Sequence, residues 1–273
     1  MPKIVLPIAN GFYESDSLPI SAQECVNFYP NIAQAPALNQ ETLYGTAGLE
    51  EVANTNSLTG NRGAHEMNGV PYFVVNTKLY SMAADYTLTL IGTVEGTSRV
   101  SMADNGTQLL VLVPSGKGYI YNHVTDAFAE ITDSDFTANG APQLVVYIDG
   151  FFCLTTDSKK FIVSALNNGL SYNALDFGTA ESDPDEIVAP IVFNNQLFIG
   201  GSQTIEAFQN IGGADFPFQR TGLFLSKGIV SPFSIQSLQD TFVFIGAGQN
   251  ESPAIWTLQG NNVAKISTTA IDK

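Results

Sequence analysis

The sequence predicts an all-β protein, a β-propeller of four-stranded antiparallel blades that follows a non-repeating N-terminal arm. Three observations predict this fold. Turn residues return at a spacing of roughly 40 to 45 residues, which is typical of propeller blades. Short runs rich in Val, Ile, Phe and Tyr lie between the turns, and helical periodicity is scarce. Because 44% of the 273 residues are apolar, the chain can bury a sizeable core.

The recurring turns predict one β-hairpin in each repeat unit, between its first and second strands. Asn-Gly and Asp-Gly pairs supply the positive φ angles that two-residue hairpins require. The five turns are Asn68-Gly69, Asn105-Gly106, Asp149-Gly150, Asn194-Asn195 and Gln239-Asp240. The strand after each turn is the most apolar of its unit, for example Leu109–Val113, which indicates burial on both faces.

Two further strand-like runs complete each unit, so that we expect about five blades of four strands. Their approximate ranges are 63–98, 99–141, 142–186, 187–228 and 229–273. The fifth blade is expected to begin with one strand over Ile229–Ile235. A β-sandwich or a solenoid is the alternative, but near-constant hairpin spacing favours the propeller. Because no leftover strand closes the fifth blade, we expect the ring to continue beyond this chain, as part of a longer protein.

Residues 1–60 do not repeat and predict an extended arm or lead-in, ahead of the blades at 61–273. This segment contains five prolines, which favour an extended path, and scattered aromatic residues. Such an arm contacts a neighbouring subunit or folds against its own propeller, and the sequence leaves both open. Within it, Asn31–Gln40 is a candidate inter-subunit element.

The net charge excludes a protein that binds nucleic acid through its phosphate backbone. The formal net charge is −15, with 11 Lys and Arg against 26 Asp and Glu. Binding to phosphates depends on basic residues that displace counterions. An acidic surface can still line a passage through which DNA slides. The longest purely apolar runs have five residues, too short to span a membrane, and the first residues resemble no secretory signal. The sequence therefore predicts no membrane association.

No catalytic residue, cofactor site or metal site is predicted. The two histidines, His65 and His123, have no metal-ligand spacing, and Pro114–Gly118 predicts a hairpin turn, not a phosphate loop. Paired acids at Asp133 and Asp135 and at Asp183 and Asp185 leave one alternative open, a propeller that binds carbohydrate or hydrolyses glycosides. Three arginines and a single tryptophan argue against that alternative.

The N-terminal part resembles a known family. Cys25-Val-Asn-Phe-Tyr-Pro-Asn is followed by Leu43-Tyr-Gly-Thr-Ala-Gly-Leu. These segments resemble the signature of the packaged-DNA stabilisation proteins, also called tail accessory factors or tail hubs, of short-tailed bacteriophages. Ala47 departs from the family, in which proline is commoner at that position. The matching residues are Asn27, Tyr29, Pro30, Gly45, Thr46, Gly48 and Leu49.

The resemblance implies a structural virion protein that is not an enzyme. It implies a homo-oligomeric ring, most often a hexamer, that is assembled in the host cytoplasm and docks below the portal and its adaptor ring in the tail. Such a hub closes the DNA channel after packaging and holds a distal needle, nozzle or fibre. DNA passes through the channel without tight binding.

Overall fold

A computed structural model describes residues 25–36, 41–114, 116–180, 186–213, 216–268 and 271–272. The chain divides into two compact units. Unit 1 comprises Met1–Val52 with Thr268–Lys273, and its described strands are β1 (Phe28–Ile32) and β2 (Glu41–Gly45). Unit 2 comprises Ala53–Ser267 and contains five antiparallel sheets.

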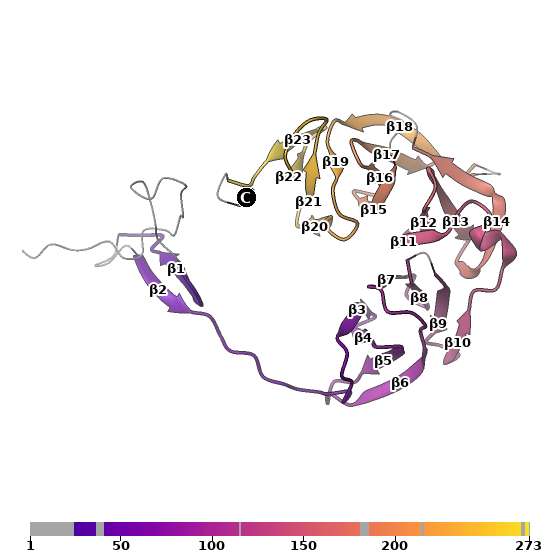
Figure 1. Ribbon diagram of the computed structural model, residues 1–273, viewed down its shortest axis with the longest axis horizontal. Helices are drawn as coiled ribbons and strands as arrows, with labels where there is room; N and C mark the ends of the chain where they lie inside the picture. Colours follow the sequence, from indigo (N-terminus) through magenta and orange to yellow (C-terminus); the bar gives the residue numbers. More distant parts are fainter. Residues whose placement is uncertain are drawn as a thin grey trace, which may run out of the picture. The chain divides into compact units, whose positions relative to one another are not determined.

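The five sheets of unit 2 are the propeller blades, and each is formed by consecutive strands (Figure 1). Blade 1 holds β3 (Asn61–Met67), β4 (Val70–Val75), β5 (Lys78–Met82) and β6 (Leu88–Thr93). Blade 2 holds β7 (Ser101–Asp104), β8 (Gln108–Leu112), β9 (Gly118–Asn122) and β10 (Ala127–Glu130). Blade 3 holds β11 (Pro142–Ile148), β12 (Phe151–Thr156), β13 (Lys160–Ala165) and β14 (Asn168–Thr179).

The last two blades follow in the same order. Blade 4 holds β15 (Ile187–Phe193), β16 (Gln196–Gly201), β17 (Ile205–Asn210) and β18 (Phe218–Leu225). Blade 5 holds β19 (Gly228–Ile229), β20 (Gln236–Leu238), β21 (Thr241–Ala247), β22 (Ala254–Gln259) and β23 (Asn262–Lys265). Within unit 2 the first strands of successive blades contact one another, from β3 through β7, β11 and β15 to β20. This arrangement confirms the predicted all-β propeller with four-stranded antiparallel blades.

The predicted hairpins form because their turn residues adopt the required backbone conformation. Asn68 and Gly69 have φ angles of 54° and 77°, and Asp149 and Gly150 have φ angles of 51° and 91°. The strands that leave these turns contribute most of the core. In blades 2, 3 and 4 the second strands β8, β12 and β16 are buried at every position after the first, because a neighbouring blade covers each face.

The two end blades are buried on one face only. On β4, Tyr72 and Val74 join the core cluster shared with blade 2, while the alternate residues are more exposed. On β21, Phe242 and Phe244 join the cluster shared with blade 4, and the alternate residue Ile245 is exposed. The outward faces of blades 1 and 5 are therefore apolar surfaces that no described blade covers.

Blade 5 departs from the prediction at its first strand. The expected strand over Ile229–Ile235 is wrong, because the chain forms two short strands, β19 and β20, that both pair with β21. Pro232 lies between them and has no backbone N–H to donate to a sheet. A turn replaces the strand there, with a hydrogen bond from Ser234 N to Ser231 O of 3.1 Å.

Candidate functional site

The two motif segments of the N-terminal part pair with each other in the β1–β2 hairpin. Pro30 lies opposite Leu43, and Gly45 lies opposite Phe28. Thr46 closes the hairpin, because its N and Oγ1 both donate to Asn27 O, at 2.9 and 3.2 Å. Asn27 adopts a φ of 60°, which Asn tolerates better than most residues. Five of the seven motif residues thus belong to one local structure.

The remaining motif residues, and the tyrosines of the two motif segments, lie on the surface. Gly48 and Leu49 follow the hairpin and are exposed. Tyr29 contacts Tyr44 across the hairpin, with 5.8 Å between ring centroids. Tyr44 was not singled out from the sequence, although its place in the second motif segment was a usable signal. Of the candidate element Asn31–Gln40, residues 37–40 lie outside the described residues.

The opposite side of the hairpin is mainly apolar. Phe28, Pro30 and Ile32 alternate along β1 and share a face with Leu43 of β2, and Glu41, which lies opposite Ile32, is at the end of the same face. Phe28 is 54% exposed and Ile32 is 65% exposed. A two-stranded sheet is marginally stable by itself, and three strands or a packed face are needed for independent stability. We call this surface the hairpin apolar face, defined by Phe28, Pro30, Ile32 and Leu43.

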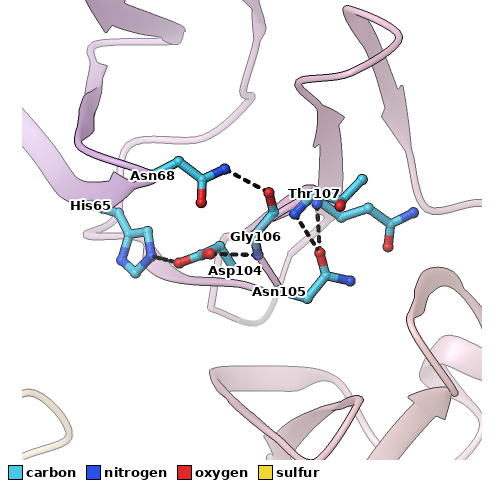
Figure 2. Close-up of polar contacts among 7 residues, drawn as sticks. His65, Asn68, Asp104, Asn105, Gly106 and Thr107 are labelled. Carbon is cyan, nitrogen blue, oxygen red and sulfur yellow. Dashed lines mark hydrogen bonds and ion pairs between the residues drawn. The ribbon is translucent and has the colours of Figure 1, made fainter.

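In unit 2, polar contacts join the turns of neighbouring blades. Figure 2 shows His65 and Asn68 of blade 1 beside the β7–β8 turn of blade 2. His65 Nε2 lies 2.7 Å from Asp104 Oδ2, and Asn68 Nδ2 donates to Gly106 O at 2.7 Å. Asp104 Oδ1 accepts from Gly106 N at 2.7 Å, which fixes the turn. His65 is therefore a structural residue at a blade junction.

The turns between first and second strands lie at one edge of unit 2, which we call the turn face. The first strands of blades 1 and 2 run in the same direction, because hydrogen bonds join their starts (Val100 N to Arg62 O) and their ends (Asn68 to Gly106). Acidic residues lie at this edge in four of the five blades. They are Asp85, Asp104, Asp126, Asp149 and Asp240.

The basic residues of the described part of unit 2 lie elsewhere. Except for Arg220 within β18, all lie at strand ends or loops of the opposite edge. They are Arg62, Lys78, Arg99, Lys117, Lys159, Lys160, Lys227 and Lys265. The turn face therefore presents carboxylates without a lysine or arginine among the residues that the structure describes.

Most of these cations are engaged within the protein. Lys117 Nζ lies 3.1 Å from Glu95 and 3.2 Å from Glu130, and Lys227 pairs with Glu251. Three further cations contact an aromatic ring or a carboxylate. Arg99 lies over the Phe233 ring, Lys160 lies over the Phe177 ring, and Arg220 Nε lies 2.9 Å from the buried Glu206. These side chains are poorly placed to bind a phosphate backbone.

First strands of all five blades line a cavity of about 340 Å³ near the centre of unit 2. Its lining includes His65, Ser101, Val145, Ile191 and Gln236, one from each blade. The guanidinium of Arg99 and the ring of Phe233, 4.2 Å apart, also line it. The Ser101 hydroxyl in this lining accepts from Val145 N at 3.0 Å and donates to Val145 O at 3.4 Å, and His65 Nε2 contacts Asp104, so the structure shows no hydrogen bond between this hydroxyl and the imidazole.

The paired acids of blade 2 have a structural role. Asp133 caps the short 3-10 helix η1 (Ser134–Thr137), since its Oδ1 accepts from Asp135 N at 3.0 Å. Its Oδ2 accepts from Tyr172 N at 2.9 Å, and Asp135 Oδ2 accepts from Ala174 N at 3.2 Å. These bonds tie the blade 2–3 connection to β14. The other predicted pair, Asp183 and Asp185, lies outside the described residues.

The capping bonds make a pH-dependent contribution to stability. Bonds from Tyr172 N and Asp135 N hold the pKa of Asp133 below its usual value. A depressed carboxyl pKa gives stabilisation that is present above the unfolded pKa of about 3.9 and is lost as pH falls through the folded pKa. We expect Asp133→Ala to lower the free energy of unfolding by about 1–2 kcal/mol at neutral pH.

Urea denaturation of both proteins across a pH series checks this expectation. The difference between wild type and Asp133→Ala should shrink below about pH 4. Asp133→Asn retains one acceptor and serves as the control, with a smaller and pH-independent loss. An Asp133→Ala difference that stays constant down to about pH 2 would contradict the assignment.

The residues that the structure describes contain neither a metal-binding cluster nor a membrane-spanning helix. No group of three or more His, Cys, Asp or Glu side chains is arranged to hold a metal ion. No helix in the same residues has the length and apolar character needed to cross a bilayer. Cys153 is buried, and burial raises the pKa of its thiol, as expected for a small core residue.

The comparison with protein families matches nearly the whole chain. The family model described as "Bacteriophage P22 Gp10, beta-propeller" matches residues 4–273. Among curated proteins, the tail hub protein gp10 of Salmonella phage P22 is 25% identical over 242 residues. That alignment covers 80% of this chain and 50% of the relative. The chain therefore spans about half the length of the curated relative that it matches.

Solved structures with low sequence identity have a similar fold. Virginiamycin B lyase from Staphylococcus aureus has a TM-score of 0.55 at 14% identity, over 79% of this chain and 73% of that chain. BamB from Moraxella catarrhalis has a TM-score of 0.51 at 11% identity, over 76% of this chain and 61% of that chain. At these identities the likeness concerns the fold alone.

Proposed function

The chain belongs to the family of the bacteriophage P22 Gp10 β-propeller, and from this premise we propose that it is a subunit of a ring-shaped tail hub. Members of this family are structural proteins of the phage virion. The observation that carries the proposal is the family match over residues 4–273, which includes both the hairpin and the five blades. The similarity to the tail hub protein of Salmonella phage P22 supports the same role.

In this proposal the hub docks below the portal and its adaptor ring and closes the DNA channel after packaging. The charge distribution supports a channel role. The turn face carries carboxylates without described basic residues, and most cations of unit 2 are held by carboxylates, aromatic rings or carbonyl groups. Such a surface repels the phosphate backbone, so DNA can move past it without binding to it.

We propose that the hub is a homo-oligomer, with the hexamer of the family as the expected state, and that it holds a distal needle, nozzle or fibre. The hairpin supports an arm that reaches a neighbouring subunit. It forms a unit separate from the blades and exposes Phe28 and Ile32. Its residues Asn27, Tyr29, Pro30, Gly45 and Thr46, with Gly48 and Leu49 after it, are the proposed interaction residues.

The proposal includes no catalysis. Asp133 and Asp135 are occupied by backbone amides, which argues against a glycoside-hydrolysing pair there. The phenol of Tyr121 is unsuited to act as a base, because burial, together with a hydrogen bond to Asp126, raises its pKa to about 12. No observation on the described residues favours the carbohydrate-binding or glycoside-hydrolysing alternative.

We expect the purified chain to bind free duplex DNA weakly near physiological salt. With a net charge of −15 and its cations engaged, the protein has few groups that can release counterions. Fluorescence anisotropy with a labelled duplex at several salt concentrations measures this. A sub-micromolar Kd whose logarithm falls steeply with salt would contradict the channel role.

A further inference from the structure

A second cavity, of about 640 Å³, lies at the edge of unit 2 opposite the turn face. Its walls come from the start of β3, the β4–β5 turn and the connection between blades 1 and 2. The polar side chains of its lining are Thr59, Asn61, Arg62, Asn76, Thr97 and Arg99. We call this space the Arg62–Arg99 cavity. Its volume lies within the range of about 300–1,000 Å³ that is usual for small-molecule sites.

The Arg62–Arg99 cavity contains positive charge that no neighbouring carboxylate offsets. Among the described residues, no Asp or Glu lines it or the central cavity, although the chain has 26 acidic residues. Arg62 is 7% exposed, and its guanidinium donates to carbonyl groups and not to a carboxylate. Burial lowers the pKa of Arg62, because desolvation disfavours the charged form. An anion bound in this cavity would therefore stabilise the charge.

Arg99 supplies free hydrogen-bond donors to the same cavity. Its guanidinium carbon lies 4.2 Å from the centroid of the Phe233 ring, and no hydrogen bond or ion pair joins it to the described residues. By contrast, Arg220 Nε lies 2.9 Å from a carboxylate oxygen of Glu206. The contact with the ring restricts the Arg99 side chain without using its N–H groups. Such a guanidinium can donate two parallel hydrogen bonds to an anion.

The number of free donors favours a carboxylate over a phosphate. Arg62 already donates four hydrogen bonds to carbonyl groups, so Arg99 provides the free fork of donors. A carboxylate accepts two parallel N–H bonds from one such fork. A phosphate group has at least three acceptor oxygens and close to two negative charges, and it requires more donors. The net charge of −15 also repels a polyanion such as DNA.

We propose that the Arg62–Arg99 cavity binds a carboxylate ligand, either an organic acid or the acidic side chain of a peptide. The guanidinium of Arg99 donates to the carboxylate, and the Phe233 ring positions that guanidinium. Arg62 attracts the anion through its charge. This site goes beyond the proposed tail hub, because it depends on contacts within one chain and not on assembly in the tail.

Side-chain NMR of the full chain tests the site. The chain has three arginines, so the spectrum of arginine Nε–H groups contains three signals, and Arg99→Lys identifies one of them. At constant ionic strength, succinate should shift the Arg99 signal saturably, with a Kd of about 1–10 mM. The Arg220 signal should stay unchanged, because Glu206 occupies that side chain. Succinamide, of similar size but uncharged, should shift neither signal.

Matched variants separate this site from general electrostatic attraction. Backbone amide shifts of Gly60 and Thr97, which line the cavity, report binding in every variant. Arg99→Ala should weaken succinate binding at least about tenfold, and Arg99→Lys should recover only part of the loss, because an ammonium lacks the planar fork. Lys78→Ala removes a positive charge at the same edge outside the lining and should change the Kd less than about twofold. Circular dichroism checks that each variant is folded.

Titration with a blocked tripeptide that has a central glutamate distinguishes the source of the carboxylate. Tighter binding of the peptide than of succinate would assign the site to a protein ligand, and equal or weaker binding would assign it to an organic acid. Three results would overturn the inference: tighter binding of inorganic phosphate than of either carboxylate, equal effects of Arg99→Ala and Lys78→Ala, or no saturable shift up to about 50 mM succinate. Absence of the protein from virions would remove the hub and leave this site intact.

Discussion

Arg62→Ala should lower the free energy of unfolding by about 3–5 kcal/mol, because it removes a buried cation that four backbone carbonyls solvate. The guanidinium donates to Ser98 O at 2.7 Å, Asn76 O at 2.8 Å, Val94 O at 2.9 Å and Glu95 O at 3.1 Å. One side chain thus joins the β4–β5 turn, the end of β6 and the connection to blade 2. In Arg62→Ala these carbonyl groups would lose their hydrogen-bond donor while they remain partly buried.

Urea denaturation of the full chain measures this loss. Arg62→Lys should recover less than half of it, because an ammonium cannot reproduce the planar fork of donors. Arg99→Ala is the matched control in the same region. Arg99 is exposed and lies over Phe233, so its removal should cost only about 0.5–1 kcal/mol. Equal stability losses in Arg62→Ala and Arg99→Ala would show that the carbonyl contacts contribute little.

Gly228→Ala should destabilise the protein by about 3 kcal/mol or more, through the junction between blades 4 and 5. Gly228 begins β19, where an added Cβ would overlap backbone atoms of Ser202 and Gln203 in the β16–β17 turn. Backbone cannot rotate away as a flexible side chain can, so one of the two blades must shift. Ile229 and Phe242 would then lose contacts in the core cluster that the blades share.

The matched control is Gly60→Ala, since a Cβ there meets no atom within 4 Å. Its effect should stay within about 1 kcal/mol. Thermal melting of both variants, followed by circular dichroism, checks the difference. If Gly228→Ala melts at the wild-type temperature, the close approach of β19 to blade 4 is incorrect.

The parts of the fold that depend on local chemistry were predictable. The hairpin turns followed from Asn-Gly and Asp-Gly pairs, because few other residues tolerate the φ angles found at Asn68 and Asp149. Burial of the second strands followed from their uninterrupted apolar runs. Pro232 was a local sign that the first strand of blade 5 breaks. It did not decide the prediction, because proline also occurs within strands at edge or bulge positions.

The contacts that join distant parts of the chain could not be predicted. The role of Arg62 depends on carbonyls at residues 76, 94, 95 and 98, and carbonyls carry no signature in a sequence. The pairing of the two N-terminal motif segments was also missed, because the residues between them contain no hairpin turn signal. The separation of acidic and basic residues became visible only when the topology assigned each turn to an edge.

The presence of this protein in the virion is the most direct test of its role as a tail hub. Quantitative mass spectrometry of purified particles measures its copy number against the portal protein, and electron microscopy of the tail locates it. We expect a fixed stoichiometry of several copies per particle, six for a hexameric hub, as a ring below the portal. Absence of the protein from purified virions, or a variable substoichiometric amount, would contradict the tail hub.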